Sequence, residues 1–167
     1  MVDVFLISEK TLKTKSYIND NVDSCYILPA IQTAQDLGLQ PLIGTCLYNE
    51  LKQQVASGDI KPSYLILLND YITPYLTFKV MADIQLPLAY KQRNSGVVQT
   101  STEHVQNTTF SDAQSMATYY NDKATFYGSR LTDYLCHHSS EYPEYKSCGC
   151  DGMKPDKDAW NMGIFLG

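Results

Sequence analysis

Side chains that can bind a metal or act as nucleophiles gather in one stretch of this sequence, which contains Cys136, His137, His138, Cys148 and Cys150. Zinc requires thiolates and imidazoles that converge tetrahedrally, usually from pairs spaced C-x2–4-C or H-x3–5-H. Here the histidines are adjacent and the later cysteines are spaced C-x-C. We therefore expect no metal site, with Cys136 facing the helix core and the histidines capping the helix end. The alternative is a small metal-binding or thiol-dependent protein that uses the Cys136–Cys150 region.

Catalytic and cofactor-binding motifs are missing elsewhere in the sequence. It contains no G-x-S-x-G nucleophile elbow, no P-loop and no G-x-G-x-x-G fingerprint, and no protease signature surrounds any cysteine. We therefore expect a protein that is not an enzyme and has no cofactor.

Length and composition are typical of one soluble globular domain. The chain has 167 residues and a net charge of −5, which argues against a general nucleic-acid binder because phosphate neutralisation needs clustered Lys and Arg. The N-terminal sequence MVDVFLISEK lacks the features of a signal peptide, and no apolar run is long enough to span a bilayer. With five cysteines, an odd number, we expect buried free thiols and synthesis in a reducing cytoplasm.

The strongest helix signal covers residues 111–138. Ser111 is the expected N-cap, and Asp112 suits the positive end of the helix dipole. The buried stripe repeats at three-and-four spacing and is rich in tyrosine. Its members are Ala113, Met116, Ala117, Tyr120, Ala124, Tyr127, Leu131, Tyr134 and Leu135.

Three earlier segments also predict helices. The first runs from Asn21 or Asp23 to Gly38. The second starts at Gln40-Pro41 and ends at Gly58, and the third runs from an N-cap at Ser63 to about Arg93, with kinks at Pro74 and Pro87. The expected fold is mainly α, a bundle of about four to five helices with its helical core over 20–138.

Two segments have no helical pattern. Residues 96–110 are β-branched and polar, which predicts an extended arm or β-hairpin projecting from the core. Residues 139–167 predict an irregular, extended C-terminal tail that ends in large apolar side chains. We expect interfaces with neighbouring chains at both segments and on the flank of the 111–138 helix. The candidate residues are Val97, Val98, Val105, Phe110, Tyr119, Phe126, Trp160, Ile164, Phe165 and Leu166.

The order of the segments resembles a family of virion proteins from tailed bacteriophages. The resemblance rests on Pro41-Leu42-Ile43-Gly44 and Leu47-Tyr48 early, Asn94-Ser95-Gly96-Val97 in the middle, and Phe126-Tyr127, Arg130-Leu131 and Tyr134-Leu135 late. It covers roughly residues 5–136 and is similar to the head-to-tail connector, or adaptor, proteins of crAss-like and related phages. The Cys-rich tail departs from that pattern.

The resemblance implies a subunit of a dodecameric ring below the portal, which continues the DNA channel toward the tail. The implied partners are further copies of the chain, the portal protein and other tail or connector rings, with DNA passing through without sequence-specific binding and no membrane involved. Because ring contacts are head to tail, each subunit needs two different surfaces. We expect the arm and the segment 160–166 to supply one surface, and the helices the other.

Overall fold

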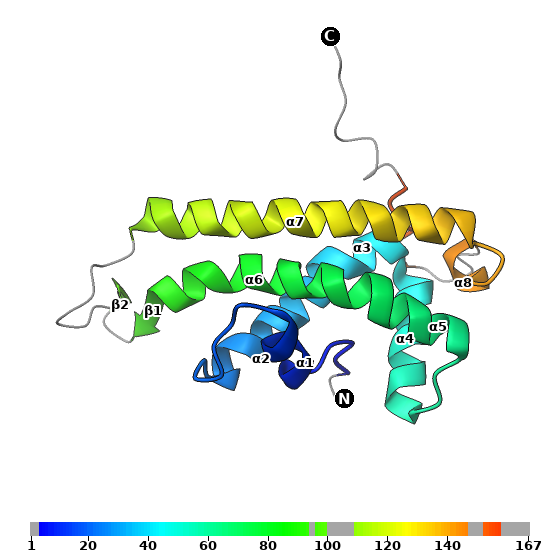
Figure 1. Cartoon of the computed structure of the whole chain (residues 1–167), viewed down its shortest axis with the longest axis horizontal. Helices are drawn as coiled ribbons and strands as arrows, with labels where there is room; N and C mark the ends of the chain where they lie inside the picture. Colours follow the sequence, from blue (N-terminus) through cyan, green and yellow to red (C-terminus); the bar gives the residue numbers. More distant parts are fainter. Residues whose placement is uncertain (1–3, 94–95, 100–108, 147–151, 158–167) are drawn as a thin grey trace, which may run out of the picture.

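The computed structural model describes residues 4–93, 96–99, 109–146 and 152–157 (Figure 1). It confirms the mainly helical fold. Two long antiparallel helices, α6 (Thr73–Ala89) and α7 (Phe110–His137), form the spine of the molecule and share its most extensive contact. Helices α1 (Glu9–Lys15) and α2 (Ser24–Thr33) lie on the side of α6 that faces away from α7, whereas α3 (Gln40–Ile43) contacts α7 (Figure 1).

Helix α7 begins one residue before the predicted range, and its N-cap is Thr109 rather than Ser111. The Thr109 hydroxyl accepts a hydrogen bond from the Asp112 backbone N–H at 3.2 Å, and the Asp112 carboxylate accepts one from the Thr109 N–H at 3.2 Å. This reciprocal pair is a capping box, which a Ser111 cap could not form with Asp112. The predicted stripe is confirmed at Ala113, Tyr120, Ala124, Leu131 and Leu135, which are buried, whereas Met116 is exposed.

The predicted helix from Ser63 starts instead at Pro62, and it consists of three consecutive segments. These are α5 (Pro62–Ile66), the π-helical segment η2 (Leu67–Ile72) and α6. A regular α-helix would bring the Pro74 ring against the carbonyl of Asp70. Asp70 lies within η2, where the wider π turn lets the helix continue through the proline.

A π-helical segment also precedes a proline earlier in the chain. There α2 (Ser24–Thr33) continues into the π-helical segment η1 (Ala34–Leu39), and α3 (Gln40–Ile43) follows with Pro41 in its first turn. The prediction that Gly38 ends this helix is wrong, because the helix passes through Gly38 and Pro41 and ends at Gly44. Gly44 has a φ of 80°, a conformation that an L side chain rarely adopts. Helix α4 (Thr45–Ser57) follows and ends, as predicted, at the left-handed Gly58.

A hairpin is present, but it is not the one predicted within residues 96–110. The prediction that the preceding helix continues to about Arg93 is wrong, because α6 ends at Ala89 and the next four residues form the first strand. Strand β1 (Tyr90–Arg93) pairs antiparallel with β2 (Gly96–Gln99), in a register that places Tyr90 opposite Gln99 and Arg93 opposite Gly96. The arm's remaining residues before Thr109 lie outside the described part of the chain.

The chain after α7 returns to the core. Tyr142 and Tyr145 are buried, and the short helix α8 (Pro143–Lys146) packs beside α4. The Tyr142 hydroxyl donates to the Ser63 carbonyl at 2.9 Å, and the Tyr64 hydroxyl donates to Glu144 at 2.5 Å. At the other end of the chain, α1 (Glu9–Lys15) buries Leu12 against α2. None of the described helices is both long and apolar enough to cross a membrane.

Candidate interaction surfaces on the long helix

One flank of the α6–α7 pair carries an exposed aromatic cluster, which we call the aromatic flank. Its floor is a stacked pair, Phe78 of α6 and Tyr127 of α7, with ring centroids 5.3 Å apart. Tyr119 and Phe126 stand at its rim and are 52% and 67% exposed, and the Lys123 amine lies 4.3 Å from the centre of the Tyr119 ring. Asp122 completes the lining of a shallow depression of about 430 Å³. Exposed large rings of this kind are typical of contact surfaces.

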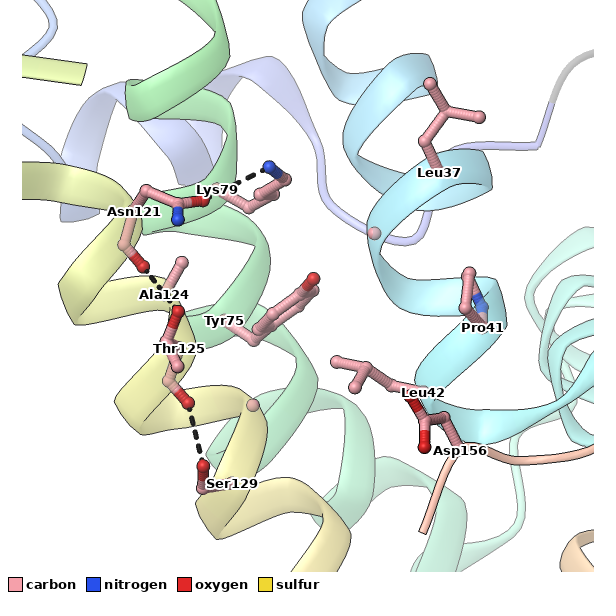
Figure 2. Close-up of a pocket in the computed structure, with 12 residues that line it drawn as sticks. Leu37, Pro41, Leu42, Tyr75, Lys79, Asn121, Ala124, Thr125, Ser129 and Asp156 are labelled. Atoms are coloured by element: carbon pink, nitrogen blue, oxygen red, sulfur yellow. Dashed lines mark hydrogen bonds between the residues drawn. The ribbon is translucent and has the colours of Figure 1, made fainter. Parts of the chain in front are cut away.

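The second feature is a hollow of about 450 Å³ between α7, α6 and the η1–α3 segment. Figure 2 shows Tyr75 and Lys79 of α6 at its centre, α7 side chains on one side, and Leu37, Pro41 and Leu42 on the other. Its lining consists of Leu37, Gly38, Pro41, Leu42, Tyr75, Lys79, Asn121, Ala124, Thr125, Gly128, Ser129 and Asp156. Most of the surface that lines the hollow is apolar, so the hollow suits a hydrophobic side chain better than a charged ligand.

Two glycines allow the helices around the hollow to approach closely. A Cβ at Gly38 would stand 2.7 Å from the Tyr75 hydroxyl oxygen, and a Cβ at Gly128 would stand 3.3 Å from both Leu42 and Tyr75. Tyr75 is only 5% exposed, and burial raises the pKa of its hydroxyl well above the usual range, helped by the negative charge of Asp83. Gly38 therefore serves tertiary packing rather than helix termination.

The charged groups at the hollow are held by their neighbours. The Lys79 amine lies 3.3 Å from both Asn121 Oδ1 and Asp83 Oδ1. Burial raises the pKa of the Asp83 carboxyl, and the nearby Lys79 partly opposes that shift. Asp156 lies at the opposite edge, where its backbone N–H donates to the Pro41 carbonyl at 2.9 Å. Lys79 thus lies near the centre of the hollow and Asp156 at its edge, so the two charges occupy separate places.

Residues 152–157 are fixed where α3 meets α4. The Thr45 backbone N–H donates to the Met153 carbonyl, and the Met153 N–H donates to the Thr45 hydroxyl, both at 2.9 Å. A Cβ at Gly44 would stand 2.8 Å from Pro155, so only glycine fits beneath this segment. This part of the predicted tail is therefore anchored beside the hollow.

The cysteines do not follow the prediction of buried free thiols. Cys25 and Cys136 are free but exposed, and Cys46 is disulfide-bonded. Cys136 cannot face the core because the adjacent Leu135 occupies the buried stripe of α7. Its sulfur lies instead 3.7 Å from the Tyr145 hydroxyl, and burial together with this contact raises the pKa of Tyr145.

The two histidines do interact with the end of α7, as predicted. His137 Nδ1 lies 2.8 Å from the Asp133 carbonyl, and His138 Nδ1 lies 3.1 Å from the Tyr134 carbonyl. Within the described ranges no three His, Cys, Asp or Glu side chains are arranged to hold a metal ion. Cys148 and Cys150 lie outside those ranges.

The structure describes only some of the predicted interface residues. Tyr119 and Phe126 lie together on the aromatic flank, while Phe110 is 57% exposed at the start of α7, near Tyr90. Val97 and Val98 are in strand β2. The candidates outside the described residues are Val105, Trp160, Ile164, Phe165 and Leu166.

The hollow itself was not predicted from the sequence. Its walls come from three segments far apart in the chain, and their lining residues have ordinary helical spacing. The one available signal was Gly128, a glycine inside a strongly periodic helix, which often marks a close approach of another element.

Comparisons with known proteins give a family and no function. No curated protein and no solved structure matches the chain. A family model does match residues 39–152, which include α4, the α6–α7 pair and α8. The chain therefore belongs to the family of unknown function DUF6712.

Proposed function

We propose that this chain is a virion structural protein of a tailed bacteriophage, a connector subunit that forms a ring at the head-to-tail junction. In this role it assembles below the portal and continues the DNA channel toward the tail. The proposal starts from the resemblance in segment order described above. It assigns no catalytic role to any residue.

The observation that carries the proposal is the exposure of α7 on two chemically different sides. One side of this 28-residue helix packs on α6, while one flank presents exposed aromatic rings and the other borders an apolar hollow. Ring subunits joined head to tail need two such unlike surfaces. Net acidity supports the same role, because a net charge of −5 disfavours tight binding of DNA that must slide through a channel.

The test is the amount of this chain in purified virions of the phage that encodes it. We expect the chain to be present at the copy number of the portal protein, and to bind purified portal rings. Its absence from virions, or a copy number unrelated to that of the portal, would reject the proposal.

Metal analysis of the same purified protein tests the alternative, a small metal-binding or thiol-dependent protein. We expect no stoichiometric zinc. A full equivalent of zinc that is lost in a Cys136→Ser variant would favour the alternative instead.

A further inference from the structure

We infer that the aromatic flank of one copy of this chain docks into the hollow of the next copy, with Phe126 as the inserted side chain. The inference rests on the proposed function and names the subunit contact of the ring. Four observations on the described residues support it. The two surfaces lie on opposite sides of α7, their shapes and their charges are compatible, and they occupy the same turns of the helix.

The two surfaces lie on opposite sides of the helix. Successive residues of an α-helix are about 100° apart around its axis, so Phe126 and Gly128 project about 200° from one another. Gly128 is buried beside the hollow, whereas Phe126 is 67% exposed on the other flank. One molecule therefore presents a projecting side chain and a receiving site in opposite directions, which is the arrangement that a heterologous contact requires.

The shapes of the two surfaces are complementary. Phe126 is the most exposed aromatic ring of the flank, and the hollow has room for a large ring at about 450 Å³. Its apolar wall includes Leu37, which is 75% exposed in the isolated chain. Insertion of a neighbour's ring would remove both Phe126 and Leu37 from water, which is favourable for apolar surface.

The charges also match. The aromatic flank carries Lys123 and Asp122, and the hollow carries Asp156 and Lys79. Charges of both signs thus border each surface, and a head-to-tail contact can bring opposite charges face to face, which fixes its orientation. Because one chain carries both unlike surfaces, the partner is a second copy, bound head to tail.

Both surfaces occupy the same turns of α7. Phe126 lies within the span from Asn121 to Ser129 that borders the hollow. A neighbour can therefore dock without a large shift along the helix. A heterologous contact closes into a ring when the rotation that relates the copies has no translation along its axis, and it otherwise produces an open helical filament.

The test measures molecular mass by light scattering for the full chain and two variants, each altered on one surface. Phe126→Asp removes the inserted ring and leaves the hollow intact, whereas Thr125→Trp fills the hollow from its exposed edge and leaves the aromatic flank intact. We expect wild type to self-associate and each variant to show a dissociation constant raised by at least about tenfold. Ile66→Asp is the matched control, since Ile66 is exposed on α5 and lines neither surface; it should assemble like wild type.

Mixing the two variants provides the decisive result. Each retains the surface that the other has lost, so an equimolar mixture should give a dimer with one copy of each and nothing larger. Phe126→Ala and Ser129→Arg replace the pair if either variant fails to fold by circular dichroism.

Three results would overturn the inference. They are wild type that stays monomeric up to about 1 mM, a single variant that assembles like wild type, and a mixture without the dimer. If wild type and Phe126→Asp both form rings, the docking contact is wrong and the connector proposal stands. If the complementary dimer forms but the chain is absent from virions, the connector proposal fails and the contact stands.

Discussion

At the scale of single residues, the start of α7 depends on the hydrogen-bonded pair Thr109 and Asp112. We expect Thr109→Ala to lower the free energy of unfolding by about 1 kcal/mol, the usual effect of losing an N-cap, measured by urea denaturation. Ser115→Ala is the control, because the Ser115 hydroxyl only donates back to the Ser111 carbonyl at 2.8 Å within the same helix. Equal effects of the two substitutions would contradict the importance of the cap.

The hydrogen-bonded pair Thr109 and Asp112 also predicts that the stability of the fold depends on pH. Hydrogen bonds from the Thr109 hydroxyl and backbone N–H hold the pKa of Asp112 below its usual value. A carboxyl whose pKa is lower in the folded state stabilises the fold at neutral pH, and this contribution is lost as the pH falls through the lowered pKa. The stability difference between wild type and Asp112→Asn should therefore be present at neutral pH and vanish in acid. If the stability difference between wild type and Asp112→Asn persists in acid, the charge of Asp112 is not its cause.

Gly38 tests the close packing of η1 on α6. We expect Gly38→Ala to destabilise the fold by about 1–3 kcal/mol, the usual cost of overpacking, because its Cβ would stand 2.7 Å from the Tyr75 oxygen. Tyr75→Phe removes that oxygen, so the alanine should cost less in the Tyr75→Phe background. A double-mutant cycle in thermal unfolding measures this difference. Additive effects would show that the Tyr75 hydroxyl is not the obstacle.

At the scale of elements, one helix carries both a core face and a contact face. Leu131 is fully buried on the core face of α7, and Leu131→Ala should lower the free energy of unfolding by about 2–5 kcal/mol. Phe126→Ala, on the exposed flank of the same helix, should change it by less than about 0.5 kcal/mol while weakening self-association. Chemical denaturation of dilute monomer separates the two effects. A large loss of monomer stability in Phe126→Ala would place that side chain in the fold rather than in a contact.

The helices differ in how far the sequence alone could define them. The apolar spacing of α7 was sufficient to predict that helix, and the glycine after α4 was sufficient to predict where α4 ends. Local periodicity determines the first feature, and one left-handed residue determines the second. The π-helical segments before Pro41 and Pro74 were not predictable, since their wide turns depend on how the surrounding helices pack. The same holds for Gly38, whose role is visible only once Tyr75 is placed beside it.

At the scale of the whole molecule, the tail was the least predictable region. Residues 139–146 have no helical periodicity, yet they bury Tyr142 and Tyr145 completely or nearly so. Hydrogen bonds hold this segment to Ser63 and Tyr64, which lie 79 and 80 residues earlier in the chain than their partners Tyr142 and Glu144. The candidate surfaces were predictable only in part. Exposure of Tyr119 and Phe126 followed from their positions beside the buried stripe, whereas the hollow required three distant segments.

The many buried tyrosines give the whole molecule a defined response to alkali. Burial is the main cause that raises the pKa of five phenols, Tyr48, Tyr64, Tyr75, Tyr142 and Tyr145, in the folded chain. An acid whose pKa is raised on folding binds its proton more tightly in the native state, so this stability is complete below the unfolded value of about 10 and is lost as the pH rises above it.

We therefore expect the fold to lose stability steeply above about pH 10, with tyrosinate absorbance rising together with the loss of helical circular dichroism. Tyr142→Phe separates ionisation from packing, because it keeps the ring and loses the titrating group together with its hydrogen bond to Ser63. That variant should be less stable than wild type at neutral pH and should lose less stability between neutral and alkaline pH. If tyrosinate absorbance rises to its full value while the helical signal is unchanged, ionisation of the buried phenols is not coupled to folding.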